Sequence, residues 1–238
     1  TDAEAALYDP MKDPEAQELA RETAAYCADP NMVDVELLGS NQAKLCVSEA
    51  YLKYAQECGI SVYLDFGWMT NAFIIDYMAQ ALEEEGHVFG YLSSVDGFNR
   101  NLDIRTTNYS QNIFHRRDNT VYMPAILEYS GAMSLVSLRD YPMSEKDRWT
   151  YYAYGDGSIS HVFLNPADGM SRASIDGILA YSRDAGCAEI LLKNAPVFIA
   201  EDFDSDALEA LAREGIDSVY CEENSVICTE NTDSVRIA

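Results

Sequence analysis

The sequence predicts an α+β fold in which a largely antiparallel sheet is flanked by helices. Strand-like segments follow one another from residue 88 to residue 165, whereas helical patterns are grouped before and after them. The chain has 238 residues, and 48% of them are apolar, which is enough to bury a sizeable core. It contains no tandem repeat, low-complexity tract or linker. We therefore expect one domain with a helical N-terminal part (1–59) and a sheet-rich body (60–238).

The chain is strongly acidic, with 40 Asp and Glu residues against 16 Lys and Arg residues and a net charge of −24. Nucleic acids and anionic membrane surfaces bind clustered basic side chains, so neither is an expected partner. An anionic small ligand would need cations close to its site, because salt screens charges beyond about 8 Å. No apolar run reaches the roughly 18 residues of a membrane span, and the opening residues do not resemble a signal peptide.

Two helices are predicted in the N-terminal part. Asp13 precedes Pro14, a combination of N-cap residue and first-turn proline, and this helix should run to about Cys27. Ser48 is the expected N-cap of a second helix in "SEAYLKYAQECG", which Gly59 ends.

The sheet-rich body begins with a predicted strand, turn and helix. "ISVYLDF" (60–66) favours a strand, Gly67 a sharp turn, and residues 71–85 a helix that Gly86 ends. Apolar residues recur in this helix at steps of three and four, which places them on one face. They are Ile74, Ile75, Met78, Ala81 and Leu82.

A long series of strands follows. Strand-like sequences occupy residues 88–94, 101–107, 110–117, 120–130, 132–138, 149–155 and 158–165. The sequence "YGDGS" (154–158) predicts a hairpin between the last two. After the segment 172–182 we expect helices near 184–194 and 205–214, and then a closing hairpin in "YCEENSVIC" (220–228).

The six cysteines contain no C-x-x-C pair, so a structural zinc site is not expected. Cys221 and Cys228 flank the closing hairpin and could face each other across it. The alternative, which we favour, is that all six are free thiols in or near the core.

Three stretches, in this order, carry motifs of a known family: "LDFGWMTNAFIID" (64–76), "SLRDY" (137–141) followed by "HVFLNPADG" (161–169), and "SIDGILAYSRDAGCAEILLKNA" (174–195). Together they resemble the FAD:protein FMN transferase family, also called ApbE-like proteins. The order and spacing of the motifs carry the resemblance, which covers about two thirds of the chain and leaves the first sixty residues poorly matched. Members of that family bind FAD and, with magnesium, transfer FMN to a threonine of a partner protein.

The first motif implies cofactor-binding positions at Asp65, Gly67, Trp68 and Asn71, and "VDGF" adds Asp96 and Gly97. The resemblance is incomplete here. Trp68 stands where the family has a glycine, and Asn71 stands where it has a lysine. Trp68 could stack on a flavin or other aromatic ring, or it could be a core residue that fills an emptied pocket, which we favour.

The second motif implies His161 and Asp140 as catalytic residues, with Ser137, Asn165 and Gly169 at the cofactor. Asn165 replaces an aspartate of the family pattern. Imidazole is the side chain that titrates near neutral pH, so His161 would act as a base or would orient the acceptor. It could equally be a hydrogen-bonded strand histidine.

The third motif implies a metal ligand at Glu189, but Lys193 replaces the threonine that would be the second ligand. The Lys193 ammonium could occupy the place of the metal. The interpretation we favour is a surface ion pair between residues four apart on a helix, which contributes about 0.2–0.5 kcal/mol. Magnesium prefers several oxygen ligands, and the sequence no longer offers the family's set.

These departures lead us to expect a divergent ApbE-like protein that has lost magnesium-dependent FMN transfer and retains a cleft for a small ligand or nucleotide. The alternatives are an active transferase that uses FAD and magnesium, and a fold kept for contact with a partner protein, for which the 16 tyrosines would suit an exposed surface. The resemblance also implies export from the cytoplasm and a lipid anchor.

Overall fold

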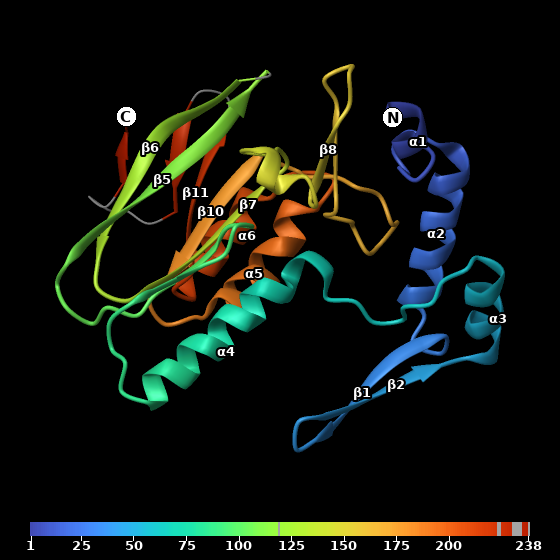
Figure 1. Ribbon diagram of the computed structural model, residues 1–238, viewed down its shortest axis with the longest axis horizontal. Helices are drawn as coiled ribbons and strands as arrows, with labels where there is room; N and C mark the ends of the chain where they lie inside the picture. Colours follow the sequence, from blue (N-terminus) through green and yellow to red (C-terminus); the bar gives the residue numbers. More distant parts are fainter. Residues whose placement is uncertain (119, 223–224, 230–234, 238) are drawn as a thin grey trace.

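The computed structural model describes residues 1–118, 120–222, 225–229 and 235–237, and its architecture is the predicted α+β fold (Figure 1). A six-stranded antiparallel sheet forms the centre of the body. Its strand order is β12 (Ser225–Cys228), β11 (Asp217–Glu222), β10 (Gly177–Ser182), β7 (Met133–Arg139), β4 (Phe98–Asn101) and β3 (Tyr91–Ser93).

A second sheet and three helices cover the central sheet. The second sheet has the strand order β13 (Val235–Ile237), β6 (Thr120–Ser130) and β5 (Asn108–Arg117). The helices are α4 (Thr70–Glu84), α5 (Cys187–Phe198) and α6 (Ser205–Arg213). Ile178 and Ala180 of β10 pack in the cluster that includes α4 and α5, whereas Leu179 and Tyr181 pack in the cluster shared with β5 and β6. Successive strand residues point to opposite faces, so the central sheet is buried on both.

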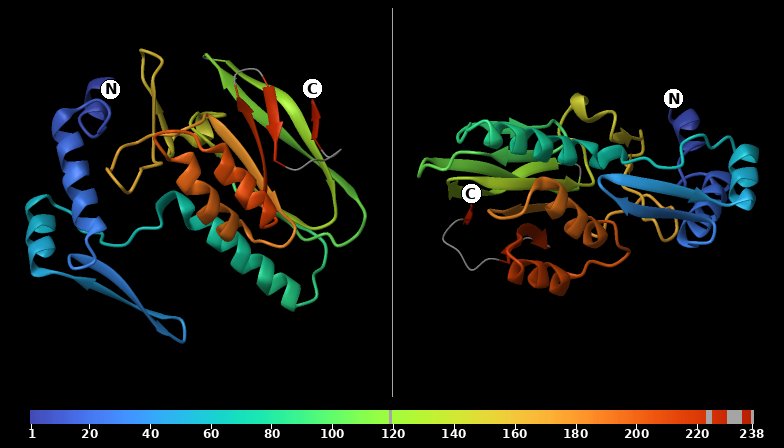
Figure 2. Two further views of the ribbon diagram at one scale, coloured as in Figure 1. Left: turned by 180° about the vertical axis from the view of Figure 1, so that it is seen from behind. Right: turned by 90° about the horizontal axis from the view of Figure 1, so that it is seen from below.

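The N-terminal part lies at one end of the body in all three views (Figures 1 and 2). It consists of α1 (Asp2–Ala6), α2 (Pro14–Ala28), β1 (Val33–Gly39), β2 (Gln42–Val47) and α3 (Glu49–Glu57). Both predicted caps are present: the Asp13 carboxylate accepts from Glu15 N at 2.9 Å, and the Ser48 hydroxyl accepts from Tyr51 N at 3.1 Å. The β1–β2 hairpin was not predicted, and it makes the prediction of a helical N-terminal part incomplete.

Residues 60–66, all of which the structure describes, form no strand, so that prediction was wrong. The segment connects the N-terminal part to the body, and Val62, Leu64 and Phe66 expose 62%, 52% and 52% of their surface. A strand needs a neighbour to satisfy its backbone groups. Alternation of apolar residues is therefore not sufficient to form a strand when no edge of another strand lies beside the segment.

The carboxylate of Asp76, in α4, is the N-terminal cap of α5. It accepts hydrogen bonds from Cys187 N and Ala188 N, each at 2.8 Å. These amides have no partner inside their own helix, and a negative charge is favourable at a helix N-terminus. The bond fixes the rotation of α4 about its axis.

That rotation buries a different face of α4 from the predicted one. Ala72, Ile75 and Ala79 are buried, whereas Ile74 and Met78 remain 46% and 45% exposed. Asp76 lies on the buried side because it must reach α5. The spacing of apolar residues alone could not predict the buried face, because it does not show that Asp76 must bond to α5.

Most of the remaining strands follow the predictions. The β8 (Tyr151–Ala153) and β9 (Ile159–His161) hairpin closes at the predicted turn, where Tyr154 N donates to Ser158 O at 2.9 Å. Of the segment 101–107, however, only Asn101 belongs to a strand. Asp103 is buried there and pairs with Arg105 at 2.7 Å, so the backbone follows a turn.

The closing hairpin forms, but its register keeps the two flanking cysteines apart. Cys221 lies opposite Val226, and Cys228 lies opposite Val219. Cysteines that are not opposite on facing strands do not have the geometry of a cross-strand bridge. The register thus argues against the Cys221–Cys228 pairing.

Alanine at Gly97 should destabilise the fold, because Gly97 has φ +102° and an added Cβ would lie 2.6 Å from Ser137 O on β7. We expect Gly97→Ala to lower the free energy of unfolding by about 2–4 kcal/mol, since backbone strain and overpacking both contribute. Gly86→Ala is the matched control: its φ is +84°, but no atom lies within 4 Å of the added Cβ. Urea denaturation of both variants measures the difference, and equal midpoints would contradict this prediction.

Candidate functional site

A cleft of about 1100 Å³ lies between the N-terminal part and the body. One wall comes from α2 and the segment 60–65, and the other from β9 and the loop 164–171, which reaches toward α2 (Figure 1). Ligand pockets commonly have volumes of about 300–1,000 Å³, so this cleft could hold a nucleotide-sized molecule. Four of the residues predicted from the sequence line it: Asp65, His161, Asn165 and Gly169.

The wall formed by the N-terminal part was missed in the sequence analysis. Its residues on α2 recur at steps of three and four, which is the signal that could have identified them. They are Ala16, Leu19, Ala20, Thr23, Ala24 and Cys27. Tyr51 and Tyr63 extend this wall, with their rings edge to face at 6.0 Å. The wall therefore combines apolar and aromatic side chains with the carboxylates of Asp13 and Glu15 at the start of α2.

His161 is held as a neutral imidazole with a defined tautomer. The Ser171 hydroxyl donates to the backbone oxygen of His161 at 2.7 Å. Ser171 Oγ also lies 3.1 Å from His161 Nδ1. Since a hydroxyl has one proton to donate, Nδ1 must donate to Ser171 Oγ. Burial lowers the pKa of His161 to about 4, because it disfavours the charged ring. Nε2 therefore carries a lone pair.

Asn165 shapes the loop that forms the far wall of the cleft. Its Oδ1 accepts from Ala167 N at 2.9 Å, and its Nδ2 donates to Ile199 O at 3.1 Å. An aspartate could not make the second bond, because an ionised carboxylate only accepts. Gly169 closes the loop against α2: its φ is +73°, and an added Cβ would lie 2.5 Å from Ala20 O.

The turn at 65–68 joins the cleft to the core. Asp65 Oδ1 accepts from Gly67 N at 2.8 Å. The Trp68 ring packs edge to face on Phe163 at 4.8 Å, and Phe163 lies 5.1 Å from the His161 ring. In this structure Trp68 thus packs at the edge of the core, and Phe163 lies between it and His161.

A second group of predicted residues surrounds a small inner pocket of about 40 Å³, which includes Trp68, Asp96 and Ser137. Such a volume accommodates water molecules rather than a flavin. Asn71 Nδ2 donates to Asp96 Oδ2 at 2.8 Å, so Asn71 faces a carboxylate of the protein itself. Gly97 lies on this side too, with its carbonyl accepting from Ser137 N at 2.9 Å.

Asp140 does not line the cleft. It follows β7 and pairs with Arg116 at 3.2 Å. Burial raises the pKa of Asp140 to about 6, with the Arg116 charge opposing this shift and Asp176 adding to it. Its side chain is therefore positioned for an internal ion pair rather than for contact with a ligand in the cleft.

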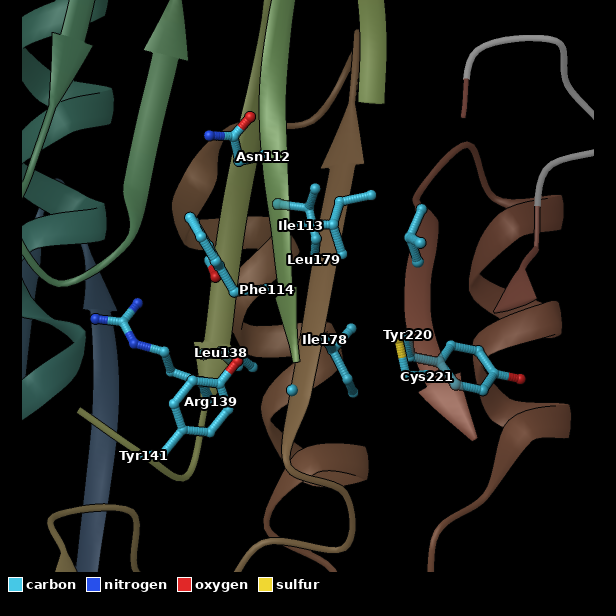
Figure 3. A pocket seen from close by; sticks show the side chains of 13 residues that line it. Asn112, Ile113, Phe114, Leu138, Arg139, Tyr141, Ile178, Leu179, Tyr220 and Cys221 are labelled. Carbon is cyan, nitrogen blue, oxygen red and sulfur yellow. The ribbon is translucent and has the colours of Figure 1, made fainter. Parts of the chain in front are cut away.

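A smaller space, lined by Arg139 and Tyr141 on either side of Asp140 in the sequence, lies between β5 and the central sheet (Figure 3). Phe114 and Ile178 line it, with Tyr220 on the β11 side, while the Arg139 side chain extends away from Tyr220. Its volume of about 20 Å³ suffices for one water molecule. This gap belongs to the core packing.

Glu189 forms an ion pair instead of an open metal position. Lys193 Nζ lies 3.1 Å from Glu189 and 2.9 Å from Glu214, and all three side chains are partly exposed. Among the residues that the structure describes, no three His, Cys, Asp or Glu side chains converge as a metal site. The residues present at Glu189 do not fit magnesium, which needs several oxygen ligands around it.

The arginines that could have supplied positive charge in three dimensions are each paired with an acid of the chain. Arg100 pairs with Glu83, Arg105 with Asp103, Arg139 with Asp147, and Arg172 with Asp168 and Glu201. Within the described ranges, no Lys or Arg lines the cleft. At neutral pH the cleft therefore offers carboxylates, aromatic rings and a neutral imidazole.

Comparison with known proteins identifies the architecture. No family model matches the chain, and none of the curated proteins matches it. Among solved structures, the crystal structure of the ApbE protein from Thermotoga maritima MSB8 is similar, with a TM-score of 0.64. The chain has the ApbE-like fold.

The similarity to this ApbE protein covers 93% of the chain and 65% of that protein, at 13% sequence identity. At this identity the ApbE-like fold is shared, and the ligand of one protein does not transfer to the other. Along the described residues, no helix is long and apolar enough to cross a membrane.

The depressed pKa of His161 can be measured by NMR. We expect its ring protons to titrate with a midpoint near 4, and the His161→Gln spectrum identifies the resonance. In the unfolded chain the ordinary pKa is near 6.5, so the unfolded state binds the proton first on acidification. The stability that comes from this group is complete above about pH 6.5 and is lost as the pH falls toward 4. A midpoint near 6.5 would contradict the burial of the ring.

Restoring an aspartate at position 165 should destabilise the loop. Asn165→Asp loses the bond to Ile199 O and places two acceptors 3.1 Å apart, which costs about 1–3 kcal/mol. Asn108→Asp, on an exposed residue of β5, controls for the added charge. Thermal denaturation of both variants at pH 7.5 checks this, and a loss no larger than that of the control would count against the assigned role of Asn165.

Proposed function

We propose that this protein is a divergent ApbE-like protein that binds a small ligand in its cleft and no longer transfers FMN. The observation that supports this proposal is the composition of the cleft, which contains His161 and Asp65 but neither Lys nor Arg among the described lining residues. The cleft is large enough for a ligand, so its charge rather than its size decides what it can hold.

A flavin dinucleotide would bring a doubly charged pyrophosphate into this cleft. Of the turn before α4, Asp65 lines the cleft, and its carboxylate already accepts from Gly67 N. A helix dipole contributes about 0.3–1 kcal/mol at an exposed site, which is little against two charges. Asp13, Glu15 and Asp65 line the same cleft and would repel it. Phosphoryl transfer depends on compensation of negative charge, which is missing here.

Magnesium, which supplies that compensation in phosphoryl transfer generally, finds no suitable ligand set at Glu189. Lys193 and Glu189 satisfy each other, and Glu214 balances the remaining charge. We therefore assign no catalytic step to this position. We also propose no catalytic role for Asp140, because it pairs with Arg116 and does not line the cleft.

Flavin binding and transfer test the loss of catalysis directly. We expect no quenching of FAD fluorescence by the protein, with or without magnesium, and no covalent flavin on a threonine-containing acceptor peptide. FAD binding that requires magnesium, together with flavin appearing on the peptide, would instead support an active transferase.

Retained ligand binding is tested with an uncharged fluorescent dye, Nile red, and a variant that fills the cleft. Ala16→Trp places a large ring on the α2 wall and should weaken dye binding at least about tenfold, since a filled site cannot bury the dye. Ala25→Trp is the matched control, because Ala25 lies on the exposed side of the same helix and does not line the cleft. Equal dye binding by both variants would overturn the proposed site.

A further inference from the structure

We propose that the ligand of this cleft is an organic cation, namely a protonated amine carried on an apolar or aromatic body. This inference rests on the proposed function, because it concerns the chemistry of the molecule that occupies the same cleft. Three independent features of the walls support it: their charge, their aromatic rings and the tautomer of His161.

The walls carry negative charge without compensating positive charge. Asp13, Glu15 and Asp65 line the cleft, and the described lining contains no Lys or Arg. Asp13 and Asp65 each use one oxygen to accept backbone amides, which leaves acceptor capacity because a carboxylate can accept about four hydrogen bonds. A cation is the ligand charge that this lining complements.

The aromatic residues provide a surface that suits a cation with an apolar body. Tyr8 and Tyr63 line the cleft with exposed ring surface, and Tyr8 is 86% exposed. Tyr51 lines the same wall but is only 3% exposed, with its ring edge to face with Tyr63 at 6.0 Å. The face of an aromatic ring attracts a cation electrostatically. Leu19 and Val62 lie in the same walls and can cover apolar parts of the ligand.

His161 distinguishes an amine with an N–H group from a quaternary ammonium. Its Nδ1 is used on Ser171, and Nε2 makes no hydrogen bond to any residue that the structure describes. As the tautomer places the lone pair on Nε2, this atom accepts a hydrogen bond and cannot donate one. A protonated amine presents the complementary N–H donor, which a quaternary ammonium lacks.

The rest of the molecule favours the same class of ligand. A net charge of −24 attracts cations to the surface and repels anions, and within the cleft the local carboxylates act at short range where salt screens little. An amine in the cleft would meet no ammonium or guanidinium in the described lining. The charge of Arg116 acts on His161, but Arg116 is paired with Asp140, and Arg172 is paired with Asp168 and Glu201.

The test is competition with Nile red by four indole compounds of similar shape. They are tryptamine, its N,N,N-trimethyl derivative, uncharged 3-ethylindole and anionic indole-3-propionate. We expect tryptamine to displace the dye at a concentration about tenfold lower than 3-ethylindole, because it alone adds the charge and the N–H donor. The trimethyl derivative should fall between them, and the propionate should not displace the dye.

A matched pair of variants assigns the charge to the cleft. Asp65→Asn removes one carboxylate and keeps an oxygen that can accept from Gly67 N, so the turn is preserved. It should weaken tryptamine about three- to tenfold and leave 3-ethylindole unchanged. Asp184→Asn, on an exposed residue that does not line the cleft, removes the same charge from the protein and should change neither.

The outcomes separate the two proposals. If the dye binds in the cleft but 3-ethylindole or the propionate displaces it as well as tryptamine does, the cation inference fails and the binding function remains. If the trimethyl derivative displaces the dye as effectively as tryptamine does, the proposed hydrogen bond from the amine to His161 Nε2 is contradicted. If Ala16→Trp does not weaken dye binding relative to Ala25→Trp, the cleft is not a ligand site and both proposals fail.

Discussion

The bond between the Asp76 carboxylate and the first amides of α5 is the constraint on which the rest of the body depends. It joins two of the helices that cover one face of the central sheet, and it decides which side of α4 is buried. Because α4 begins directly after the turn at 65–68, the same bond also sets where Asp65 and Trp68 lie relative to the cleft. A helix cap supplied by a residue distant in sequence thus influences where the turn at 65–68 lies beside the cleft.

The residues that depart from the family pattern share one property: each has a partner inside the chain. These contacts are Trp68 with Phe163, Asn71 with Asp96, Asn165 with Ile199 O, and Lys193 with Glu189 and Glu214. Buried polar groups must be paired to avoid a large desolvation cost. In this protein these side chains are paired internally, although Asp96 Oδ1 beside Asn71 has no hydrogen-bond partner among the described residues.

Local signals in the sequence were enough to predict the fold class, the helix starts at Asp13 and Ser48, and the β8–β9 hairpin, because caps and turns depend on neighbouring residues. The segment 60–66 and the buried face of α4 were mispredicted because each depends on a distant partner. The motif residues were predicted as one site, yet the folded chain distributes them among the cleft, the inner pocket and the surface of α5. The α2 wall carried a helical stripe, but nothing in the sequence linked it to His161.

The two walls of the cleft belong to different parts of the chain, and their backbones meet where Gly169 approaches Ala20. A molecule that contacts both walls would bind only while the N-terminal part and the body stay together. By thermodynamic linkage, occupancy would then raise the free energy needed to detach the N-terminal part, in proportion to the logarithm of ligand concentration. The stability of the contact between the N-terminal part and the body would therefore rise as the cleft fills with ligand.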